Sequence, residues 1–447
     1  MRKLFGTDGV RGIAGEFLTY DLAESIGYAL GKILREEKDS KPRVIIGTDT
    51  RESRTFLKEA IATGLSKAQS DSYDVGVVST PAVAYLTKQY GYDAGVMISA
   101  SHNSYEYNGI KIFGSDGFKL TDEEEERIES IIFENSVPSI DVTETIADEP
   151  SLKDEYVKYL KGYIAEDYSG IKAVIDCANG SASSTAKQIF EGSGLNAEYI
   201  GCSPDGLNIN RGCGSTHLSR LREKVLSLGA DIGLAFDGDA DRFLAIDEKG
   251  NEIDGDFVLA ILSLDLKRQG RLNHDTVVGT VMSNYGFTKF ASDNSLNFVA
   301  TKVGDRYVLE EMEKMGYSLG GEQSGHVIIR EAATTGDGQL TAIYLLNCLA
   351  ESKKTLSSLA SVMKKYPQHM VNVKADEAGK RAFKENAEIR GIINDAEKTL
   401  GSSGRILVRP SGTEPVVRIM VESMDGDLTV SLCEEVAEKI KNILGDK

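Results

Sequence analysis

At 447 residues the chain is too long for one hydrophobic core, so we expect about three or four domains. Hydrophobic residues make up 41% and charged residues 27%, which is ordinary for folded proteins and argues against a disordered or fibrous chain. The net charge of −18 disfavours broad attraction to nucleic acids or anionic lipids, so an anionic ligand would need a local basic cluster and a small-molecule pocket.

The first third of the chain alternates short apolar runs with helical patterns, which is typical of βαβ units around a mostly parallel sheet. Strands are predicted at residues 43–47, 74–78 and 94–99, and helices at 19–37, 53–69, 81–90 and 121–134. A polar stretch containing Pro138 and Pro150 follows these elements and predicts a linker.

A run of small and polar residues, SASHNSYEYNG, overlaps the end of the strand predicted at 94–99. It ends in Asn108-Gly109, which favours a turn, so we expect the Ser101 hydroxyl to be exposed at a strand end. Serine is a weak nucleophile unless it is activated, and His102 and Lys111 are candidates for proton handling and charge stabilisation. A capped turn explains this segment equally well. No G-x-S-x-G pattern supports an α/β-hydrolase.

The second part of the chain predicts strands at 172–176 and 234–236, and an acidic cluster follows the second of them. The segment LAFDGDADRF spaces Asp237, Asp239 and Asp241 two residues apart. In an extended chain such side chains point the same way, so the carboxylates can converge on one point. Converging carboxylates require a cation, and oxygen ligands suit Mg²⁺ or Ca²⁺.

The aspartate spacing also partly fits a calcium-binding EF-hand loop, since Glu248 is the twelfth residue counted from Asp237. The sixth position requires glycine but is Arg242, and the flanking runs predict strands instead of helices. We therefore prefer a magnesium site with room for a phosphate oxygen over a calcium loop or a solvated acidic turn. Arg242 would then lie where it could contact a transferring phosphoryl group.

A third unit follows, with strands predicted at 276–281 and 298–302 and helices beginning near Asn284, Gly304 and Gln339. Its segment LGGEQSGHVII carries Glu322, Ser324 and His326 between glycines. Carboxylate and hydroxyl groups of this kind suit hydrogen bonding to sugar hydroxyls. A lone histidine is more often structural than catalytic, so this segment is weak by itself.

The tail has a different pattern, with strands at 371–375, 405–408 and 416–422, a long helix ending near 400 and another from 428. Two of these strands are joined by RPSGTEP. Guanidinium, hydroxyl and backbone N–H groups there could form a cradle for a phosphate dianion. The groups concerned are Arg409, Ser411, Gly412, Thr413 and, on the next strand, Arg418. An ordinary hairpin with Pro410 and Gly412 as turn formers is the alternative.

These patterns predict an α/β fold with three similar mixed α/β domains and a smaller C-terminal α+β domain. We place the domains at residues 1–153, 154–253, 254–366 and 367–447. Five scattered cysteines without a C-x-x-C pair indicate reduced thiols. The start, MRKLFGTDGVRG, lacks the apolar region of a signal peptide, and no apolar run approaches the ~18 residues of a membrane span, so we expect a cytoplasmic protein.

Five motifs resemble, in the same order and along essentially the whole chain, those of the α-D-phosphohexomutase family. They are FGTDGVRG (5–12), SASHNS (99–104), DGDADR (237–242), GEQSGH (321–326) and RPSGTEP (409–415). The resemblance implies four domains around a central cleft, each contributing one loop. The start of the chain and GLNINRGCGSTH (206–217) are most similar to bacterial members that interconvert glucosamine 6-phosphate and glucosamine 1-phosphate on the route to UDP-N-acetylglucosamine. Ser104 and Ala240 stand where the family commonly has proline and glycine.

The resemblance also implies a role for each loop. Ser101 would be a phosphoserine that passes its phosphoryl group through a bisphosphorylated sugar, with a sugar 1,6-bisphosphate as activator. One Mg²⁺ would be held by Ser101, Asp237, Asp239 and Asp241. Lys111 and His326 would be general base and acid in an order left open, and Arg11, His102 and Arg242 would stabilise phosphoryl charge. The sugar phosphate would be bound by Gly304, Asp305, Arg306, Glu322, Ser324, Arg409, Ser411, Gly412, Thr413 and Arg418.

Other functions remain open on the sequence. The same loops could serve a phosphomannomutase or phosphoglucomutase, because no residue is a decisive reader of the amine at C2. A serine-phosphate phosphatase would use water as acceptor, but five dispersed histidines offer no second metal cluster. A non-catalytic sugar-phosphate-binding protein has no use for Ser101 and the aspartates together. The sequence leaves the oligomeric state open, with a homodimer, as is common in relatives, as one outcome. We expect no nucleic-acid or membrane partner.

Overall fold

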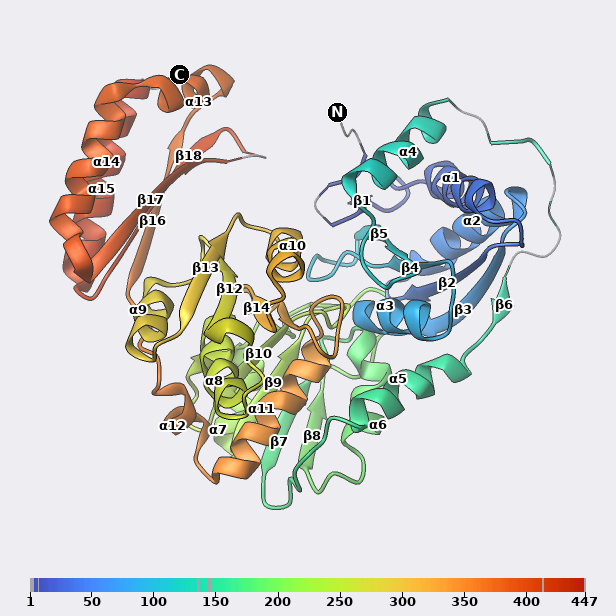
Figure 1. Ribbon diagram of the computed structural model, residues 1–447, viewed down its shortest axis with the longest axis horizontal. Coiled ribbons are helices and arrows are strands. Elements are labelled where there is room, and N and C mark those ends of the chain that lie inside the picture. Colours follow the sequence, from blue (N-terminus) through green and yellow to red (C-terminus); the bar gives the residue numbers. More distant parts are fainter. Residues whose placement is uncertain are drawn as a thin grey trace. The chain divides into compact units, whose positions relative to one another are not determined.

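The computed structural model describes residues 4–6, 8–134, 137–140, 142, 146–411 and 414–445. The chain forms two compact units, residues 1–282 with 296–362 and residues 283–295 with 363–447 (Figure 1). The first unit contains three mixed sheets and the second a three-stranded sheet. The predicted fold class, three mixed α/β domains and a smaller C-terminal α+β domain, is therefore confirmed. Among the described residues, no helix combines the length and apolar character needed to span a bilayer.

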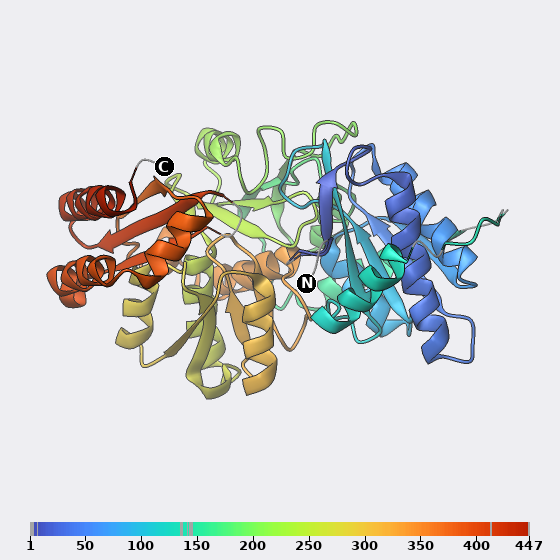
Figure 2. The ribbon, with the colours of Figure 1, turned by 90° about the horizontal axis from the view of Figure 1, so that it is seen from above.

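The first sheet has a parallel centre and an antiparallel edge. Its strand order is β1 (Val10–Ile13), β5 (Tyr107–Gly114), β4 (Ala94–Ile98), β2 (Arg43–Thr48), β3 (Asp71–Val77) and β6 (Ala147–Asp148). One face shares a core with α1 (Tyr20–Glu37), α2 (Arg54–Lys67) and α4 (Asp122–Phe133), as the blue and teal ribbons of Figure 2 show. The other face packs on α3 (Thr80–Gln89), because a Cβ at Gly47 of β2 would meet the Val83 side chain at 2.5 Å.

Local sequence signals explain where the helices of the first sheet begin. The Thr19 side chain accepts the backbone N–H of Leu22 and so caps α1. Thr121 and Glu124 form a capping box at the start of α4. The predicted strands and helices of this region are all present, with ends that shift by a few residues.

The turn predicted at Asn108-Gly109 is wrong, because both residues lie inside β5. They pair with Gly12 and Arg11 of β1 in antiparallel register. Gly109 is required there, since a Cβ would meet the carbonyl oxygen of Ser99 at 2.6 Å. What looked like turn chemistry is a place where backbones approach closely.

The second and third sheets repeat the arrangement of the first. The strand order of the second sheet is β11 (Glu252–Ile253), β10 (Phe243–Asp247), β9 (Ile232–Phe236), β7 (Lys172–Asp176) and β8 (Asn196–Ile200). The strand order of the third sheet is β13 (Asn297–Thr301), β12 (Thr276–Thr280), β14 (Leu319–Gly321) and β15 (Val327–Ile329). The helical segments of this part are α5 (Ser151–Lys161), η1 (Ser181–Ser184), α6 (Ala186–Phe190), α7 (Ser219–Leu228), α8 (Gly255–Arg268), η2 (Asn273–Asp275), α10 (Asp305–Met315), α11 (Gly338–Ser352) and α12 (Leu356–Ala360).

In all three sheets a parallel strand turns back into an antiparallel neighbour at the same topological position. The pairs are β4 with β5, β9 with β10, and β14 with β15. The connecting loops are those that carry Ser101, the three aspartates and the GEQSGH segment. The same strand-to-strand connection therefore occurs three times and each time carries one of the candidate loops.

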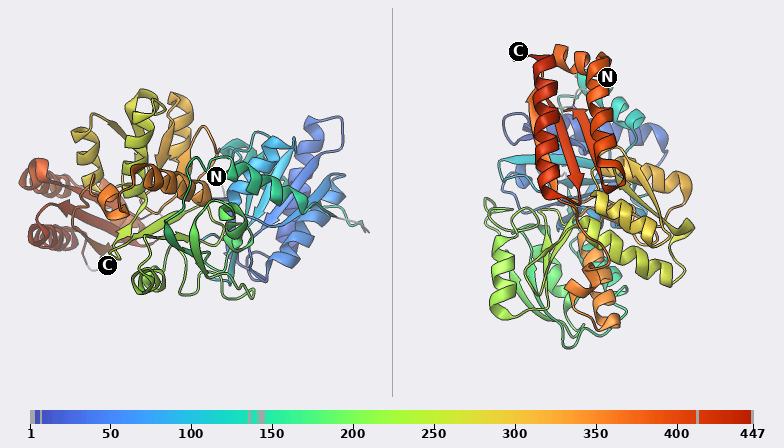
Figure 3. Two further views of the ribbon diagram at one scale, coloured as in Figure 1. Left: turned by 90° about the horizontal axis from the view of Figure 1, so that it is seen from below. Right: turned by 90° about the vertical axis from the view of Figure 1, so that its left-hand side faces the viewer.

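The second unit packs two long helices on one face of its antiparallel sheet, as the right-hand view of Figure 3 shows. Its elements are α9 (Tyr285–Asp293), β16 (Gln368–Lys374), α13 (Glu377–Glu385), α14 (Ala387–Leu400), η3 (Gly401–Ser403), β17 (Gly404–Pro410), β18 (Val416–Ser423) and α15 (Gly426–Leu444). The buried Glu422 ties α9 to this sheet, because its carboxylate accepts the Tyr285 N–H at 2.9 Å and pairs with Arg405 at 2.7 Å.

Candidate active site

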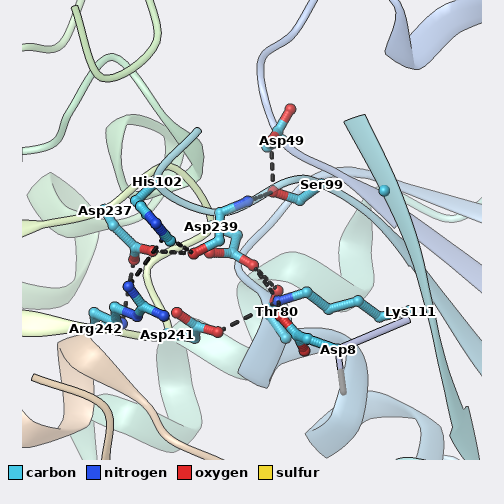
Figure 4. Close-up of polar contacts among 12 residues, drawn as sticks. Asp8, Asp49, Thr80, Ser99, His102, Lys111, Asp237, Asp239, Asp241 and Arg242 are labelled. Atoms are coloured by element: carbon cyan, nitrogen blue, oxygen red, sulfur yellow. Dashed lines mark hydrogen bonds and ion pairs between the residues drawn. The ribbon is translucent and has the colours of Figure 1, made fainter. Parts of the chain in front are cut away.

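The Ser101 hydroxyl faces the aspartate cluster. Ser101 follows β4 in a left-handed backbone conformation, with φ of 54°. Its Oγ donates a hydrogen bond of 2.5 Å to Oδ2 of Asp237, which lies near His102 and Asp239 in the close-up of Figure 4. The side chain is fully buried, so the expectation of an exposed hydroxyl is wrong. Burial against a carboxylate is an environment that suits a reacting group better than a solvated turn does.

The three aspartates converge, but through a turn and not through an extended strand. The Ala240 N–H donates to the Asp237 carbonyl at 3.1 Å, and Ala240 has φ of 54°. This left-handed conformation costs an alanine about 1–2 kcal/mol. It explains why glycine would fit this position more easily. The strand alternation predicted for this segment is therefore wrong, although the convergence it predicted is present.

The aspartate cluster has the properties of a cation site. Side-chain oxygens of Asp237, Asp239 and Asp241 all lie within 4.8 Å of one another, and the three residues are buried. Within the described residues, Oδ1 of Asp239 and Oδ1 of Asp241 are buried without a hydrogen-bond partner. Burial and the neighbouring carboxylates raise the pKa of Asp237 well above its usual value. Buried oxygens without donors fit an oxygen-seeking ion such as Mg²⁺.

Asp239 is oriented by two donors, one from α3 and one from β5 of the first sheet. Thr80, at the start of α3, donates from its hydroxyl to Oδ2 at 2.5 Å and from its N–H to the Asp239 carbonyl at 3.0 Å. Lys111 of β5 donates to the same Oδ2 at 2.8 Å. Burial raises the pKa of Asp239, but Lys111 and the hydrogen bonds outweigh it and hold that pKa below its usual range. Both donors occupy Oδ2, which leaves Oδ1 for a cation.

Acidic and basic side chains on and around the three sheets form a closed ring, which we call the charged ring. In order, its members are Lys111, Asp8, Lys119, Asp305, His326 and Asp241. The Lys119 Nζ lies 2.6 Å from the Asp305 carboxylate and also pairs with Asp8. The ring links the start of the chain, the loop after β5, the start of α10 and the two loops of the site.

His326 joins the ring through both of its nitrogens. Its Nδ1 lies 3.7 Å from the Asp241 carboxylate and its Nε2 lies 3.6 Å from the Asp305 carboxylate. The Gly336 N–H donates to Nε2 at 3.0 Å. In the neutral ring the proton is therefore on Nδ1, the nitrogen that faces Asp241.

The Lys119→Met variant should be destabilised by about 2 kcal/mol, because two largely buried carboxylates lose their shared cation. Urea denaturation monitored by circular dichroism measures the change. Lys41→Met is the matched control, since the Lys41–Asp71 pair is exposed and should contribute less than about 1 kcal/mol. Equal effects of the two substitutions would contradict a supporting role for the charged ring.

Cationic groups gather on the other side of Ser101. The Nη1 of Arg242 lies 3.0 Å from Nδ1 of His102, which is itself 3.4 Å from Oγ of Ser101. Burial, Arg242 and Arg11 lower the pKa of His102 to about 4, so the imidazole is neutral near pH 7. Nε of Arg11 and Nε of Arg242 are buried without partners among the described residues. Donors of this kind suit the oxygens of a phosphoryl group.

The third loop places its predicted sugar-binding residues in two kinds of environment. Glu322 is half-buried and accepts the Gly304 N–H at 3.2 Å, and Ser324 is exposed. Asp305 belongs to the charged ring, where its carboxylate is paired with Lys119. Arg306 forms ion pairs with Glu125 at 3.5 Å, Glu310 at 3.1 Å and Asp122.

The predicted phosphate cradle belongs to the second unit. Arg409 and Arg418 are directly opposite each other in the β17–β18 ladder. Burial and this neighbouring charge lower the pKa of Arg409. Ser411 is buried, and its Oγ accepts the Glu414 N–H at 3.2 Å. Two facing guanidinium groups would gain from a bound dianion. Gly412 and Thr413 lie outside the described residues.

Three residues of the site were missed by the sequence reasoning. Thr80 gave no motif signal, and Lys119 lies in an ordinary polar loop. Asp8 lies inside FGTDGVRG, so the motif itself was the signal that could have identified it.

The chain matches the phosphoglucomutase/phosphomannomutase family in four parts: alpha/beta/alpha domain I at residues 2–138, domain II at 154–250, domain III at 254–366 and the C-terminal domain at 370–439. It is 49% identical over 447 residues to phosphoglucosamine mutase of Thermoanaerobacter sp. (strain X514). The alignment covers 99% of this chain and 100% of the relative. The Caldicellulosiruptor saccharolyticus phosphoglucosamine mutase is 47% identical over 449 residues, with the same coverage.

Solved structures of similar proteins have the same fold. A phosphoglucomutase/phosphomannomutase family protein from Burkholderia thailandensis has a TM-score of 0.83 at 23% identity, covering 99% of this chain and 98% of that one. Aspergillus fumigatus N-acetylphosphoglucosamine mutase, solved with GlcNAc-6P and magnesium, has a TM-score of 0.67 at 18% identity, covering 100% of this chain and 96% of that one. With four domain matches and full-length relatives at nearly half identity, the chain belongs to the phosphoglucomutase/phosphomannomutase family.

Proposed function

We propose that the protein is a phosphoglucosamine mutase that interconverts glucosamine 6-phosphate and glucosamine 1-phosphate with Ser101 as phosphoryl carrier. The observation that carries this proposal is the 2.5 Å hydrogen bond from Oγ of Ser101 to Asp237, which brings a serine hydroxyl to the edge of a carboxylate cluster. The full-length relatives with this name support the choice of substrate. The product would supply the route to UDP-N-acetylglucosamine.

In the proposed cycle Ser101 begins as a phosphoserine. The bond between phosphorus and the Ser101 oxygen breaks and a bond to the free sugar hydroxyl oxygen forms. A base takes the sugar hydroxyl proton, and an acid gives a proton to the Ser101 oxygen. The bisphosphorylated sugar then turns end for end and returns its other phosphoryl group to Ser101. A sugar 1,6-bisphosphate would prime an enzyme that has lost its phosphoryl group. A bound Mg²⁺ would neutralise negative charge on the transferring group.

We assign charge neutralisation beside the transferring phosphoryl group to Lys111. Burial lowers its pKa, but Asp239, Asp8 and Asp241 outweigh this effect and raise it above the usual value. An ammonium group with three carboxylate partners is a poor base and a good electrostatic anchor. Lys111 and His326 are the two candidates for proton transfer, and the proposal does not depend on which of them is the base. Arg11, His102 and Arg242 would bind phosphoryl oxygens.

The remaining loops would hold the sugar phosphate. Glu322 and Ser324 are suited to sugar hydroxyls, and Arg409, Ser411 and Arg418 to the phosphate that is not reacting. We propose domain boundaries near residues 153, 253 and 366, so that each domain supplies one loop. A cytoplasmic location fits the five cysteines, which are all free thiols.

The substrate assignment is tested by competition among the 6-phosphates of glucosamine, glucose and mannose, each primed with its own bisphosphate. We expect kcat/KM for glucosamine 6-phosphate to exceed the other two by about tenfold or more. A higher value for glucose or mannose phosphate would reassign the substrate within the family. Release of inorganic phosphate faster than isomerised sugar would instead indicate a phosphatase.

A further inference from the structure

The backbone of Ser101 is held in a conformation that needs support. A φ of 54° is unfavourable for serine by about 1–2 kcal/mol. Such a conformation persists only where the surroundings fix it, and at a reacting residue it fixes the direction of the side chain. The groups that hold the peptide of Ser101 therefore decide where its hydroxyl points.

Two side chains from separate loops, one after β2 and one after β8, hold the same two carbonyl oxygens. Nη2 of Arg51 donates to the Ser101 carbonyl at 3.2 Å and to the Asn103 carbonyl at 2.6 Å. Nδ2 of Asn210 donates to the same carbonyls at 2.9 Å and 2.9 Å. The carbonyls of Ser101 and Asn103 are therefore held together by shared donors. The peptide that follows Ser101 cannot rotate without losing the hydrogen bonds from Arg51 and Asn210.

Arg51 is anchored within the first sheet. Its guanidinium is fully buried and forms an ion pair with the equally buried Asp49. Oγ of Ser99 donates to Asp49 at 2.6 Å and accepts the Ser101 N–H at 3.0 Å, and Figure 4 shows Asp49 beside Ser99. The buried guanidinium is stabilised by its ion pair with Asp49 and by the two carbonyl acceptors, although its Nε has no hydrogen-bond partner among the described residues.

Asn210 comes from GLNINRGCGSTH, a distinctive segment of the sequence that has no part in the proposed reaction. The Asn210 N–H donates to the Ala178 carbonyl at 2.8 Å, and the Ser215 N–H donates to the Phe236 carbonyl at 2.8 Å. Phe236 directly precedes Asp237, the acceptor of the Ser101 hydroxyl. One segment thus supports both partners of that contact.

Burying the amide of Asn210 costs free energy, and packing alone does not explain why an amide stands at this position. Its Oδ1 is buried without a partner within the described part of the chain, whereas its Nδ2 donates twice. An apolar side chain of similar size would avoid leaving an acceptor unsatisfied. Since the amide is present, its two donated bonds to the serine loop are the feature that offsets this cost.

We propose that Asn210, acting with Arg51, is a positioning residue that holds the Ser101 backbone so that Oγ faces Asp237. The inference rests on the proposed function, because it assumes that Ser101 is the phosphoryl carrier. It also explains the presence of GLNINRGCGSTH, since this segment couples the serine loop of the first sheet to the aspartate loop of the second.

The test compares Asn210→Gly with Asn208→Gly. Glycine removes the amide and accepts the positive φ of 58° at position 210. Asn208 is a matched control, since its side chain bonds the backbone of Ser203 and Asp205, just before its own segment, and not the serine loop. We expect Asn210→Gly to lower kcat by about tenfold to a hundredfold, with KM for the sugar phosphate within about twofold of wild type. Asn208→Gly should change neither quantity by more than about twofold.

A rapid-quench measurement of Ser101 phosphorylation by glucosamine 1,6-bisphosphate separates this inference from the proposed function. If wild-type Ser101 is not phosphorylated, the proposed function fails. If the wild type is phosphorylated and Asn210→Gly reacts at the same rate, the positioning role is overturned. An equal loss in Asn208→Gly would also overturn it, by assigning the effect to the fold of the segment. Asn210→Asp, which faces the two carbonyls with acceptors only, should lose at least as much and serves as the second variant if Asn210→Gly does not fold.

Discussion

The Ser101→Ala variant should fold normally and lose turnover by about 10⁴-fold or more. Turnover is lost because alanine cannot carry a phosphoryl group. The effect on the fold is small, because the hydroxyl has only two side-chain contacts within the described residues, with Asp237 and His102. Their loss should lower the free energy of unfolding by about 1 kcal/mol. The measurements are a mutase assay and mass spectrometry of the protein after incubation with a sugar 1,6-bisphosphate.

Ser104→Ala is the matched control for this experiment. Ser104 lies in the same loop but is exposed, so its loss should alter kcat by less than about twofold. A phosphorylated Ser101→Ala protein, or one that retains wild-type turnover, would show that another residue carries the phosphoryl group. Loss of activity in both variants would attribute the effect to the loop and not to the hydroxyl.

The sequence predicted the sheets better than the connections between them. Apolar runs such as 43–47 and 94–99 became β2 and β4, because a buried parallel strand needs little more than a short run of apolar residues. β5 was missed because Asn108-Gly109 resembles a turn. Its glycine is required by the Ser99 carbonyl, a neighbour that only the folded sheet supplies.

The residues of the candidate site also fall into two groups, those that the sequence could identify and those that only the folded chain brings together. Residues inside motifs, such as Ser101 and the aspartates, could be found because local spacing reports local chemistry. Lys119 could not be found, since its partners Asp8 and Asp305 are 111 and 186 positions away along the chain. Asn210 lay inside a distinctive segment, but its 2.9 Å bonds to the serine loop depend on how two sheets meet.

The Asp239→Asn variant should lose both metal affinity and turnover. Thr80 and Lys111 are both donors to Oδ2, so the oxygen of the new amide must take that position. Its NH₂ group would then occupy the place of Oδ1, the buried oxygen that has no partner among the described residues. A donor pointing at a cation is worse than a missing ligand, so we expect Mg²⁺ affinity to fall by about a hundredfold or more.

Calorimetric titration with Mg²⁺ measures this loss without relying on activity, and the rise of the melting temperature with added Mg²⁺ is a second readout. Asp205→Asn is the control, because Asp205 is exposed and its Oδ1 accepts the Leu207 N–H, which an asparagine oxygen can also do. Unchanged Mg²⁺ binding by Asp239→Asn would remove the aspartate cluster from the site. Weakened binding with normal turnover at saturating Mg²⁺ would show instead that Asp239 holds the cation but is not needed for transfer of the phosphoryl group.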